Sequence, residues 1–136
     1  MPFKYIENPE LEAETVAALR VKAGWDGRKD KLKKTIGTTY TNAACYDGEK
    51  LIGFIDVISD GVDDALIRNL VVHPEYQRKG IALNLLRIVI ERIETDCIKT
   101  VNVLFEPQLT ELYRKAGFKI INGGIIDNEE KGFDYT

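Results

Sequence analysis

The sequence is poor in the residues that metal and redox sites require. Its 136 residues include one histidine and two cysteines. Cys45 and Cys97 lie far apart and show none of the short spacings of zinc or dithiol motifs. We therefore expect reduced structural thiols and no metal site. A cytoplasmic location is the default expectation for such a chain.

Long apolar runs are also missing. No segment is long and apolar enough to cross a bilayer, and no basic-then-apolar N-terminus precedes the first strand. We therefore expect neither a membrane span nor a signal peptide. The formal net charge is only −3. The main basic cluster, residues 28–34, is expected to be the solvated face of a helix, so no nucleic-acid partner is expected.

The size and patterning of the chain predict one α/β domain. A chain of 136 residues with 44% hydrophobic content suits a single domain, residues 1–136, around one core. Turn signals and apolar patterning predict strands over residues 3–7, 41–46, 50–59, 65–72, 99–105 and 118–121, with one more strand in the tail up to Tyr135. Helical periodicity predicts helices over residues 9–23, 28–36, 81–93 and 107–116, the first capped by Asn8. The expected fold is a mixed sheet in one layer, with 99–105 as a central strand and helices on both faces.

Residues 71–82 are the most informative stretch. They read as an apolar strand, a short turn and a glycine-containing loop that opens into a long amphipathic helix. The loop and first turn are Gln77, Arg78, Lys79, Gly80, Ile81 and Ala82. Amide groups in the first turn of a helix lack intrahelical partners and lie at the positive end of the helix dipole. Gly80 permits close approach of the backbone, so the pattern predicts a site for a pyrophosphate-bearing cofactor, with an ordinary helix start as the alternative.

Two motifs together resemble a known family. Gln77-x-x-Gly80-x-Ala82 is similar to the acetyl-CoA-binding motif of the GNAT acyltransferase superfamily. Residues 112–118, Leu-Tyr-Arg-Lys-Ala-Gly-Phe, resemble the family's helix that carries a tyrosine and ends in Gly-Phe. The motifs stand at the family's spacing, and the resemblance covers nearly the whole chain. It implies a GNAT fold, a central mixed sheet flanked by about four helices, with acetyl-CoA as the cofactor.

Several segments are similar to the small GNAT branch that includes plant-type serotonin (arylalkylamine) acetyltransferases and their bacterial relatives. These segments are Leu19-Arg20, Gly24-Trp25, Leu51-Ile52-Gly53, Ser59-Asp60-Gly61 and residues 74–80. Three positions depart from the pattern. Asp56 stands where that branch often has a basic residue, Asn69 where it has an aspartate, and Pro107 where many family members have an asparagine that reaches the cofactor. The first two departures concern the acceptor, and the third concerns one cofactor contact.

The resemblance implies roles for residues outside the loop. Leu70, Val71 and Val72 would end a bulged strand whose main chain pairs with the pantetheine arm of the cofactor. Tyr113 would act as the general acid that protonates the departing thiolate of coenzyme A. From the residues alone, Tyr113 reads as a core tyrosine, because it lies on the apolar face of its helix.

The base that removes a proton from the incoming ammonium is not evident in the sequence. Asp56 lies in the middle of an apolar strand, where burial can raise the pKa of a carboxyl group; an exposed strand face is the alternative. Asp60, Glu106 and Glu111 are further candidates, and ordered water can also relay the proton. His73 precedes a proline in a turn and is expected to be a surface or structural residue.

The acceptor side is predicted from few residues. Trp25 stands at the joint between the first two helices, where the resemblance implies the wall of an acceptor site and the residues alone suggest simple core. Asp60 is the second predicted substrate-binding residue.

The resulting expectation is an N-acetyltransferase that moves an acetyl group directly from acetyl-CoA to a primary amine. The expected acceptors are small amines, arylalkylamines or polyamines, and a protein lysine or N-terminus is the alternative acceptor. A catalytically silent acyl-CoA-binding module is an alternative of a different class. An unrelated nucleotide-binding domain is disfavoured, because the sequence has no Walker lysine and no GxGxxG run. A homodimer formed at a sheet edge near the C-terminus is a further expectation.

Overall fold

The computed structural model describes residues 2–132, and these form one mixed sheet in the order β1-β2-β3-β4-β5. The strands are β1 (Lys4–Glu7), β2 (Thr41–Asp47), β3 (Lys50–Ser59), β4 (Asp64–Val72) and β5 (Thr100–Val103). The first four strands are antiparallel to their neighbours, whereas β4 and β5 are parallel. The expected α/β class with a mixed sheet is confirmed.

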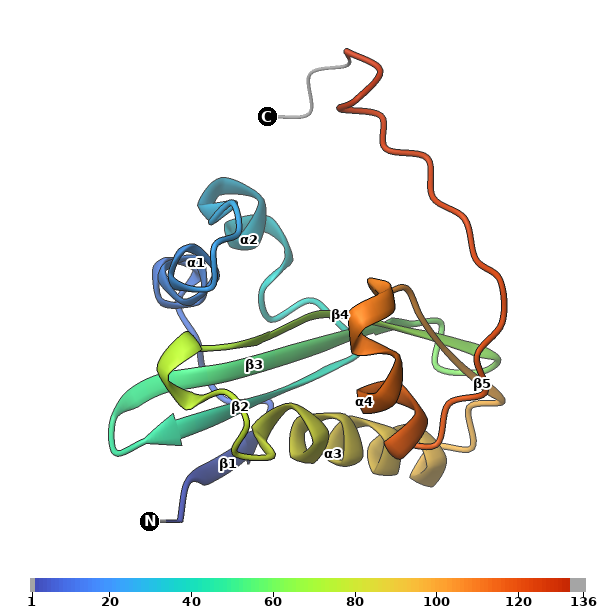
Figure 1. Ribbon diagram of the computed structural model, residues 1–136, viewed down its shortest axis with the longest axis horizontal. Coiled ribbons are helices and arrows are strands. Elements are labelled where there is room, and N and C mark those ends of the chain that lie inside the picture. Colours follow the sequence, from blue (N-terminus) through green and yellow to red (C-terminus); the bar gives the residue numbers. More distant parts are fainter. Residues whose placement is uncertain (1, 133–136) are drawn as a thin grey trace.

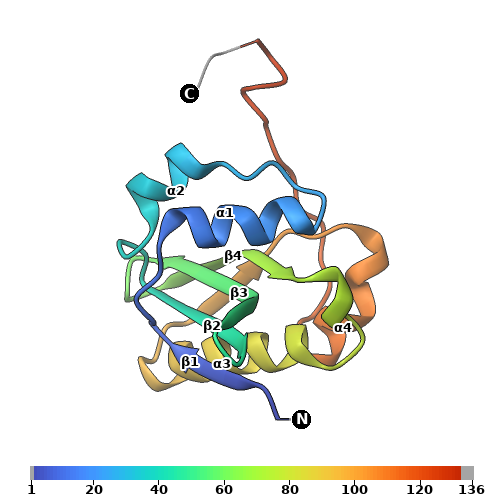
Figure 2. The same cartoon turned by 90° about the vertical axis from the view of Figure 1, so that its left-hand side faces the viewer.

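Four α-helices cover the two faces of this sheet in the described part of the chain. They are α1 (Ala13–Lys22), α2 (Lys29–Thr35), α3 (Ile81–Thr95) and α4 (Thr110–Lys115), and the short 3₁₀ helices η1 (Pro74–Tyr76) and η2 (Pro107–Leu109) precede α3 and α4. Helices α1 and α2 lie on one side of the sheet, and α3 and α4 lie on the other (Figure 1, Figure 2). The helix α3 is the crossover that allows β4 and β5 to run parallel.

The apolar stripe of α3 forms the larger core. Ile81, Leu85, Val89 and Ile93 recur at helical spacing, and each is buried against inward-facing residues of the sheet. Gly53 of β3 lies beneath the start of this helix. A Cβ atom at this position would stand 3.0 Å from Ile81 Cγ2, so a larger residue would have to displace the side chains at the start of α3 by a few tenths of an ångström. The packing therefore fixes where the N-terminus of α3 lies.

A smaller core forms beneath α1 and α2. Val16 and Leu19 of α1 and Leu32 of α2 pack there with Phe54 and Val71 of the sheet. Alternate side chains of β3 therefore point to opposite faces of the sheet. Phe54 packs in this smaller core, and Ile55 packs in the larger core beneath α3, called here the α3 cluster. Asp56 follows at the next position of the Phe54 face.

A β-bulge interrupts β4. Phe54 is opposite Val71 and Asp56 is opposite Arg68, so one residue of β3 faces two residues of β4. Asn69 lies at the bulge with φ 56°, in the left-handed region. The ladder between β4 and β5 ends at Ile67, so no strand within residues 2–132 pairs with residues 68–72 on that edge.

One strand prediction is wrong, and a second finds no strand over the residues that the structure describes. Residues 118–121 carry no secondary structure, and the next residues through 132 form no strand either. Gly123 and Gly124 weaken strand formation here. As a result β5 is an edge strand in the described chain rather than a central one. The rest of the strand expected in the tail falls partly on residues 133–136, which lie outside the described residues.

The start of the first helix also differs from expectation. Helix α1 begins at Ala13, with Glu12 as its N-cap, and Asn8 does not cap it. Asn8 extends the pairing with β2 instead, because its backbone N–H donates to Asn42 O and its Oδ1 accepts from Asn42 N. A side-chain amide that satisfies strand-end backbone groups is then not available to a helix N-terminus.

Candidate active site

The loop between η1 and α3 leaves the first amides of α3 open. Gly80 is the N-cap residue with φ 81°, and Arg78 also has a positive φ, 64°. No side chain caps this helix, and its first turn contains no acidic residue. Asn84 N–H donates to Gly80 O, so the amides of residues 81–83 precede the first intrahelical bond. These N–H donors lie at the positive end of the dipole of α3 and can bind an anion.

Open space surrounds the loop at Gly80. A Cβ atom there would meet no heavy atom within 4 Å, and residues 77–80 are exposed. A diphosphate therefore fits against the backbone, with the side chains of Arg78 and Lys79 close to it in sequence. Gln77 folds back, since its Nε2 donates to Val72 O at 3.4 Å.

The end of β4 borders this loop, and one of its backbone edges, called here the free edge, has no strand partner within residues 2–132. Val72 O on this edge accepts from the Gln77 side chain. His73 N–H donates to Ile52 O of β3, so the peptide groups of Val72 and Leu70 alternate to the opposite edge. On that opposite edge β5 has already ended its pairing, at Ile67. The bulge and this divergence together leave a stretch of strand that can pair with an extended ligand arm. Val71 lies on the other face, buried beside Phe54.

Tyr113 packs beside this edge. Its ring is 3% exposed, stacks on Phe105 at 4.4 Å between centroids and meets Phe118 edge to face. Leu70 and Val72 border the same cluster. Among residues 2–132 its hydroxyl has no hydrogen-bond partner, and Asn42 Oδ1 is the one fully buried side-chain atom there without a partner. The phenol oxygen is therefore not fully buried, although the ring is. Burial of the side chain raises the pKa of Tyr113, which keeps the hydroxyl protonated.

Asp56 is buried, so the alternative of an exposed strand face is wrong. Its Oδ1 accepts from Arg68 Nε at 3.0 Å, and Asn69 Nδ2 donates to Oδ2 at 3.3 Å. Burial raises the pKa of Asp56, although the Arg68 charge and the bond from Asn69 oppose that rise. The expectation of a raised carboxyl pKa at this position is confirmed.

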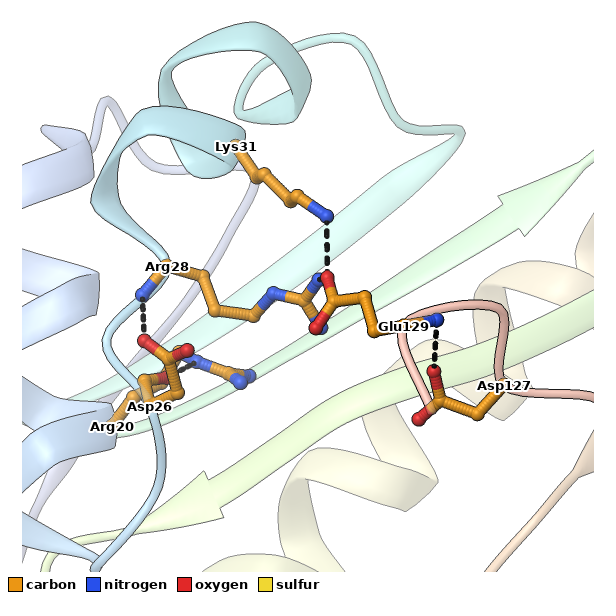
Figure 3. A network of polar contacts seen from close by, with 6 residues as sticks. All are labelled: Arg20, Asp26, Arg28, Lys31, Asp127 and Glu129. Atoms are coloured by element: carbon orange, nitrogen blue, oxygen red, sulfur yellow. Dashed lines mark hydrogen bonds and ion pairs between the residues drawn. The ribbon is translucent and has the colours of Figure 1, made fainter. Parts of the chain in front are cut away.

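Arg20 of α1 connects this carboxylate to the helical wall. Its Nη1 donates to Asn69 Oδ1 at 2.7 Å, and its Nε donates to Asp26 O at 2.9 Å. The guanidinium lies 5.0 Å from the centre of the Trp25 ring. Trp25 is 41% exposed, so it is a surface aromatic held by Arg20 rather than a core residue. Figure 3 shows Arg20 beside Asp26.

Two of the other candidate bases, Asp60 and Glu111, have structural contacts. Asp60 Oδ1 accepts from the amides of residues 62, 63 and 64, which form the β3–β4 turn and lower the pKa of Asp60. Asp60 also borders a shallow hollow with Ile58 and Leu66. Glu111 is exposed and pairs with Arg114, and Glu106 is exposed.

His73 is a structural residue, as expected. It is buried, and its Nδ1 accepts from Glu75 N as the N-cap of η1. The structure thus brings Asp56 together with Arg20, Arg68 and Asn69 on the sheet face beside α1. Tyr113 lies on the other face of the sheet, in the cluster beneath α3 that Leu70 and Val72 of β4 border. Sequence reasoning did not single out Arg20, Arg68 or Asn42 as site residues. Strand alternation puts Asp56 on one face, but only the register reveals which side chains stand opposite it.

The residues that the structure describes contain no helix long and apolar enough to span a membrane. Within the same residues no group of three or more His, Cys, Asp or Glu side chains is arranged to hold a metal ion.

An open helix N-terminus beside a bulged strand that diverges from its parallel neighbour defines a class of acyl-CoA-dependent acyltransferase domains. A sequence profile described as the acetyltransferase (GNAT) domain matches residues 9–135, and the chain belongs to this family. Its members are N-acetyltransferases that take the acetyl group from acetyl-CoA.

Individual relatives agree with this family. An uncharacterized N-acetyltransferase, ycf52, from Gracilaria tenuistipitata var. liui is 31% identical over 100 residues, which cover 70% of this chain and 55% of that protein. The chain spans about half the length of the curated relatives it matches.

Solved structures show the same fold. A GNAT-family acetyltransferase from Streptococcus pneumoniae TIGR4 has a TM-score of 0.82 at 23% identity, over 93% of this chain and 98% of that one. An aminoglycoside 6'-N-acetyltransferase complexed with coenzyme A has a TM-score of 0.71 at 17% identity, over 90% of this chain and 87% of that one.

Proposed function

We propose that this protein transfers an acetyl group from acetyl-CoA directly to a primary amine. The observation that carries this proposal is the juxtaposition of three features. The N-terminus of α3 is uncapped and open at Gly80, the free edge of β4 begins beside it, and Tyr113 packs against the same edge. These features match the three parts of an acyl-CoA: a diphosphate, an extended amide-bearing arm and a thioester.

The donor fits the residues present. The open backbone amides of residues 81–83 hold the diphosphate together with Gln77, Arg78 and Lys79, and the main chain of residues 70–72 pairs with the pantetheine arm. The cradle is built of backbone groups, so Pro107 in place of an asparagine removes at most one side-chain contact. The bound donor supplies an acetyl thioester, whose carbonyl carbon is open to attack by an amine.

Two side chains handle the protons in this proposal. The amine nitrogen forms the new bond to the acetyl carbon, the carbon–sulfur bond breaks, and the electron pair of that bond goes to sulfur. Tyr113 donates its hydroxyl proton to this sulfur, and its raised pKa makes it a donor rather than an anion at neutral pH. The nitrogen loses its second proton as the amide forms, and this proton returns through water to the Tyr113 oxygen. Asp56 accepts the proton that the incoming ammonium must lose, and its raised pKa brings it closer to a useful base.

The acceptor lies, in this proposal, on the face of the sheet beside α1 and α2. Trp25 stands at the joint of these helices as an exposed aromatic wall, and Asp60 stands at the far rim beside the exposed side chains of Ile58 and Leu66. An amine with an apolar body can cover these residues while its nitrogen points toward the bulge at Asn69. This arrangement suits a small-molecule acceptor.

A screen of amine acceptors tests the function. The protein is incubated with acetyl-CoA and with panels of small amines, amino acids and peptides, and release of free thiol is followed. We expect acceptor-dependent release with at least one panel. Binding of acetyl-CoA without release across all panels would favour the silent acyl-CoA-binding module instead, and release with peptides alone would favour a protein acceptor.

The pH dependence of turnover tests the role of Asp56. Only the neutral amine is nucleophilic, so we expect kcat to rise from acid toward mildly alkaline pH. Asp56→Asn should remove or shift this rising limb and lower kcat about tenfold, because water can relay part of the proton transfer. The kcat profile is measured at saturating acceptor for both proteins. An unchanged limb would show that Asp56 is not the base and acts by orienting Arg68.

We also propose that the protein forms a homodimer. The outer edge of β5 has no strand partner within residues 2–132, and open edges invite pairing with another chain. The unpaired segment that follows α4 exposes Ile121, Ile125 and Ile126, which a second copy would cover.

Light scattering after gel filtration tests this association. We expect about twice the chain mass of 15.4 kDa for the parent protein. The double substitution Ile121→Lys with Ile125→Lys should return the protein to the monomer mass, because it places charge on the covered face. A monomer at every concentration of the parent protein would contradict the dimer.

A further inference from the structure

We infer that the acceptor amine carries an anionic group, a carboxylate or a phosphate, and that Arg68 binds this group. The inference deepens the proposed function and rests on it. It comes from Arg68 and Asn42, two side chains on the sheet face beside α1 to which the transfer chemistry gives no role.

A row of polar side chains crosses three strands on this face. Asn42 of β2 is the cross-strand neighbour of Asp56, and Asp56 is the cross-strand neighbour of Arg68. Such neighbours have Cβ atoms close enough for side chains to share one ligand. The next row on the same face is apolar and exposed, with Ile58 opposite Leu66. The face therefore offers polar groups next to an apolar platform.

Arg20 of α1 lies beside the row and adds a second guanidinium group to that of Arg68. Arg20 is only 8% exposed, and its hydrogen bonds go to two neutral oxygens, Asn69 Oδ1 and Asp26 O. Burial and the nearby charge of Arg28 lower the pKa of Arg20, although the negative charges of Asp26 and Asp56 oppose that fall. Both carboxylates already have other partners, since Asp56 accepts from Arg68 Nε and Asp26 from Arg28 N. An anion bound beside this row would therefore add to the compensation of the two guanidinium charges.

Arg68 is the group of the row that a ligand can reach. Its side chain is 33% exposed, and Asp56 holds it through Nε. Among residues 2–132 neither Nη group has a hydrogen-bond partner. A guanidinium fixed at Nε presents its two Nη groups as a preorganised donor pair, which matches the geometry of a carboxylate or phosphate.

Asn42 adds an unused acceptor to the same row. Its side chain is 6% exposed, and its Oδ1 is fully buried without a hydrogen-bond partner in the described chain. Buried amide oxygens are normally paired, so an orphan beside Asp56 indicates that a further donor belongs here. An N–H of a bound amine, or a water that accompanies it, is such a donor.

The rim of the same network already binds a carboxylate of this chain. Arg20 contacts Asp26 O, Asp26 Oδ1 accepts from Arg28 N, and Arg28 Nη2 pairs with Glu129 at 3.3 Å (Figure 3). Lys31 Nζ also pairs with Glu129, at 3.0 Å. These pairs are solvent-exposed and hold Glu129 only weakly. The basic face thus accepts an anionic group arriving from the side of the C-terminal segment.

These features separate classes of small amine. An amine with a carboxylate or phosphate near its nitrogen, and with an apolar body, uses Arg68, Asn42 and the platform of Ile58 and Leu66. A polyamine brings further positive charge beside the guanidinium groups of Arg20 and Arg68, and an arylalkylamine leaves the Nη groups of Arg68 without a ligand. Amino acids and amino phosphates are therefore the acceptors that this face favours.

Matched pairs of probes test the inference. Phenylalanine is compared with phenethylamine, and phosphoethanolamine with ethanolamine, so that each pair differs by the anionic group alone. Binding to the protein saturated with coenzyme A is measured by calorimetry, and kcat/KM is measured by thiol release from acetyl-CoA. We expect the anionic member of at least one pair to bind roughly tenfold or more tightly than its neutral partner, because hydrogen bonds to charged groups are the strong ones. The pair that shows the preference identifies carboxylate or phosphate.

Three variants assign the preference to Arg68. Arg68→Gln should remove it by weakening the anionic probe alone, Arg68→Lys should keep part of it, and Arg87→Gln, at an exposed position of α3, should leave it unchanged. The inference would be overturned if both members of each pair bound equally, if the neutral members bound more tightly, or if no probe bound. It would also be overturned if Arg68→Gln weakened both members of a pair equally. The preference in binding without any acetyl transfer would refute the proposed function and leave the anion site intact. Acetyl transfer to neutral amines only would support the proposed function and refute the anion site.

Discussion

Replacing Gly80 by glutamate is expected to abolish the thermal stabilisation that acetyl-CoA gives to the protein. Gly80 has φ 81°, and a side chain there would enter the open space at the N-terminus of α3. The new carboxylate would compete with the diphosphate for the same amides and repel it. A ligand at about a hundred times its dissociation constant stabilises the fold by roughly 2.7 kcal/mol, so losing the shift means at least a roughly hundredfold weaker complex. Thermal unfolding with and without acetyl-CoA measures this.

Two matched variants separate charge from backbone strain. Gly80→Gln introduces nearly the same bulk and the same strain without the charge, and should retain part of the shift. Gly37 has φ 80° and equally open surroundings, so Gly37→Glu carries the same strain and charge far from the loop and should retain the full shift. An undiminished shift in Gly80→Glu would remove the loop from the donor site.

The elements that can be predicted from the sequence are those with a strong local signal. The stripe Ile81, Leu85, Val89 and Ile93 repeats every four residues, and the structure buries all four. Gly48 lies in the β2–β3 turn with φ 61°, a conformation that glycine adopts without strain, so the hairpin could be located from Asp47-Gly48. The loop at residues 77–80 could be found for the same reason, because strand, glycine and helix follow each other directly.

The contacts across strands could not be predicted. Strand alternation places Asp56 and Phe54 on one face, but the bulge at Asn69 changes the register of β4 by one residue. Without that bulge a different residue of β4 would stand opposite Asp56. The pairing of Arg68 with Asp56, and hence the preorganised guanidinium, depends on a register that no local pattern encodes. Arg20 reads in sequence as an ordinary charged helix residue, and only the packing of α1 brings it to Asn69.

The segment after α4 has a strand signal in its sequence that does not lead to a strand in the fold. Residues 118–121 have the apolar composition of a strand, yet they form none, although the outer edge of β5 has no strand partner within residues 2–132. The glycines at 123 and 124 favour departure from the sheet. The segment passes the β5 edge toward the side of α1 and α2 instead (Figure 1), where Glu129 meets Arg28. Propensity alone therefore does not decide whether this composition forms a strand.

Tyr113→Phe is expected to lower kcat on the order of a hundredfold, the usual scale for positioned proton transfer. The substitution removes one oxygen and keeps the ring that stacks on Phe105. Within residues 2–132 the hydroxyl has no hydrogen-bond partner, so its loss should change the free energy of unfolding little. The dissociation constant of acetyl-CoA should also change little, because the hydroxyl is needed as the thiolate forms. Steady-state kinetics and calorimetric binding of acetyl-CoA measure the two effects.

A second tyrosine serves as the control for Tyr113. Burial also raises the pKa of Tyr46, which lies on β2 beside the α1 cluster and away from the free edge of β4. Tyr46→Phe removes the same atom from a partly buried ring elsewhere on the sheet and should leave kcat unchanged. A large loss of kcat in Tyr113→Phe alone assigns the proton to that hydroxyl, because the two variants differ in position and not in chemistry. If Tyr113→Phe turns over within a few-fold of the parent, Tyr113 is a packing residue of the α3 cluster and water protonates the departing thiolate.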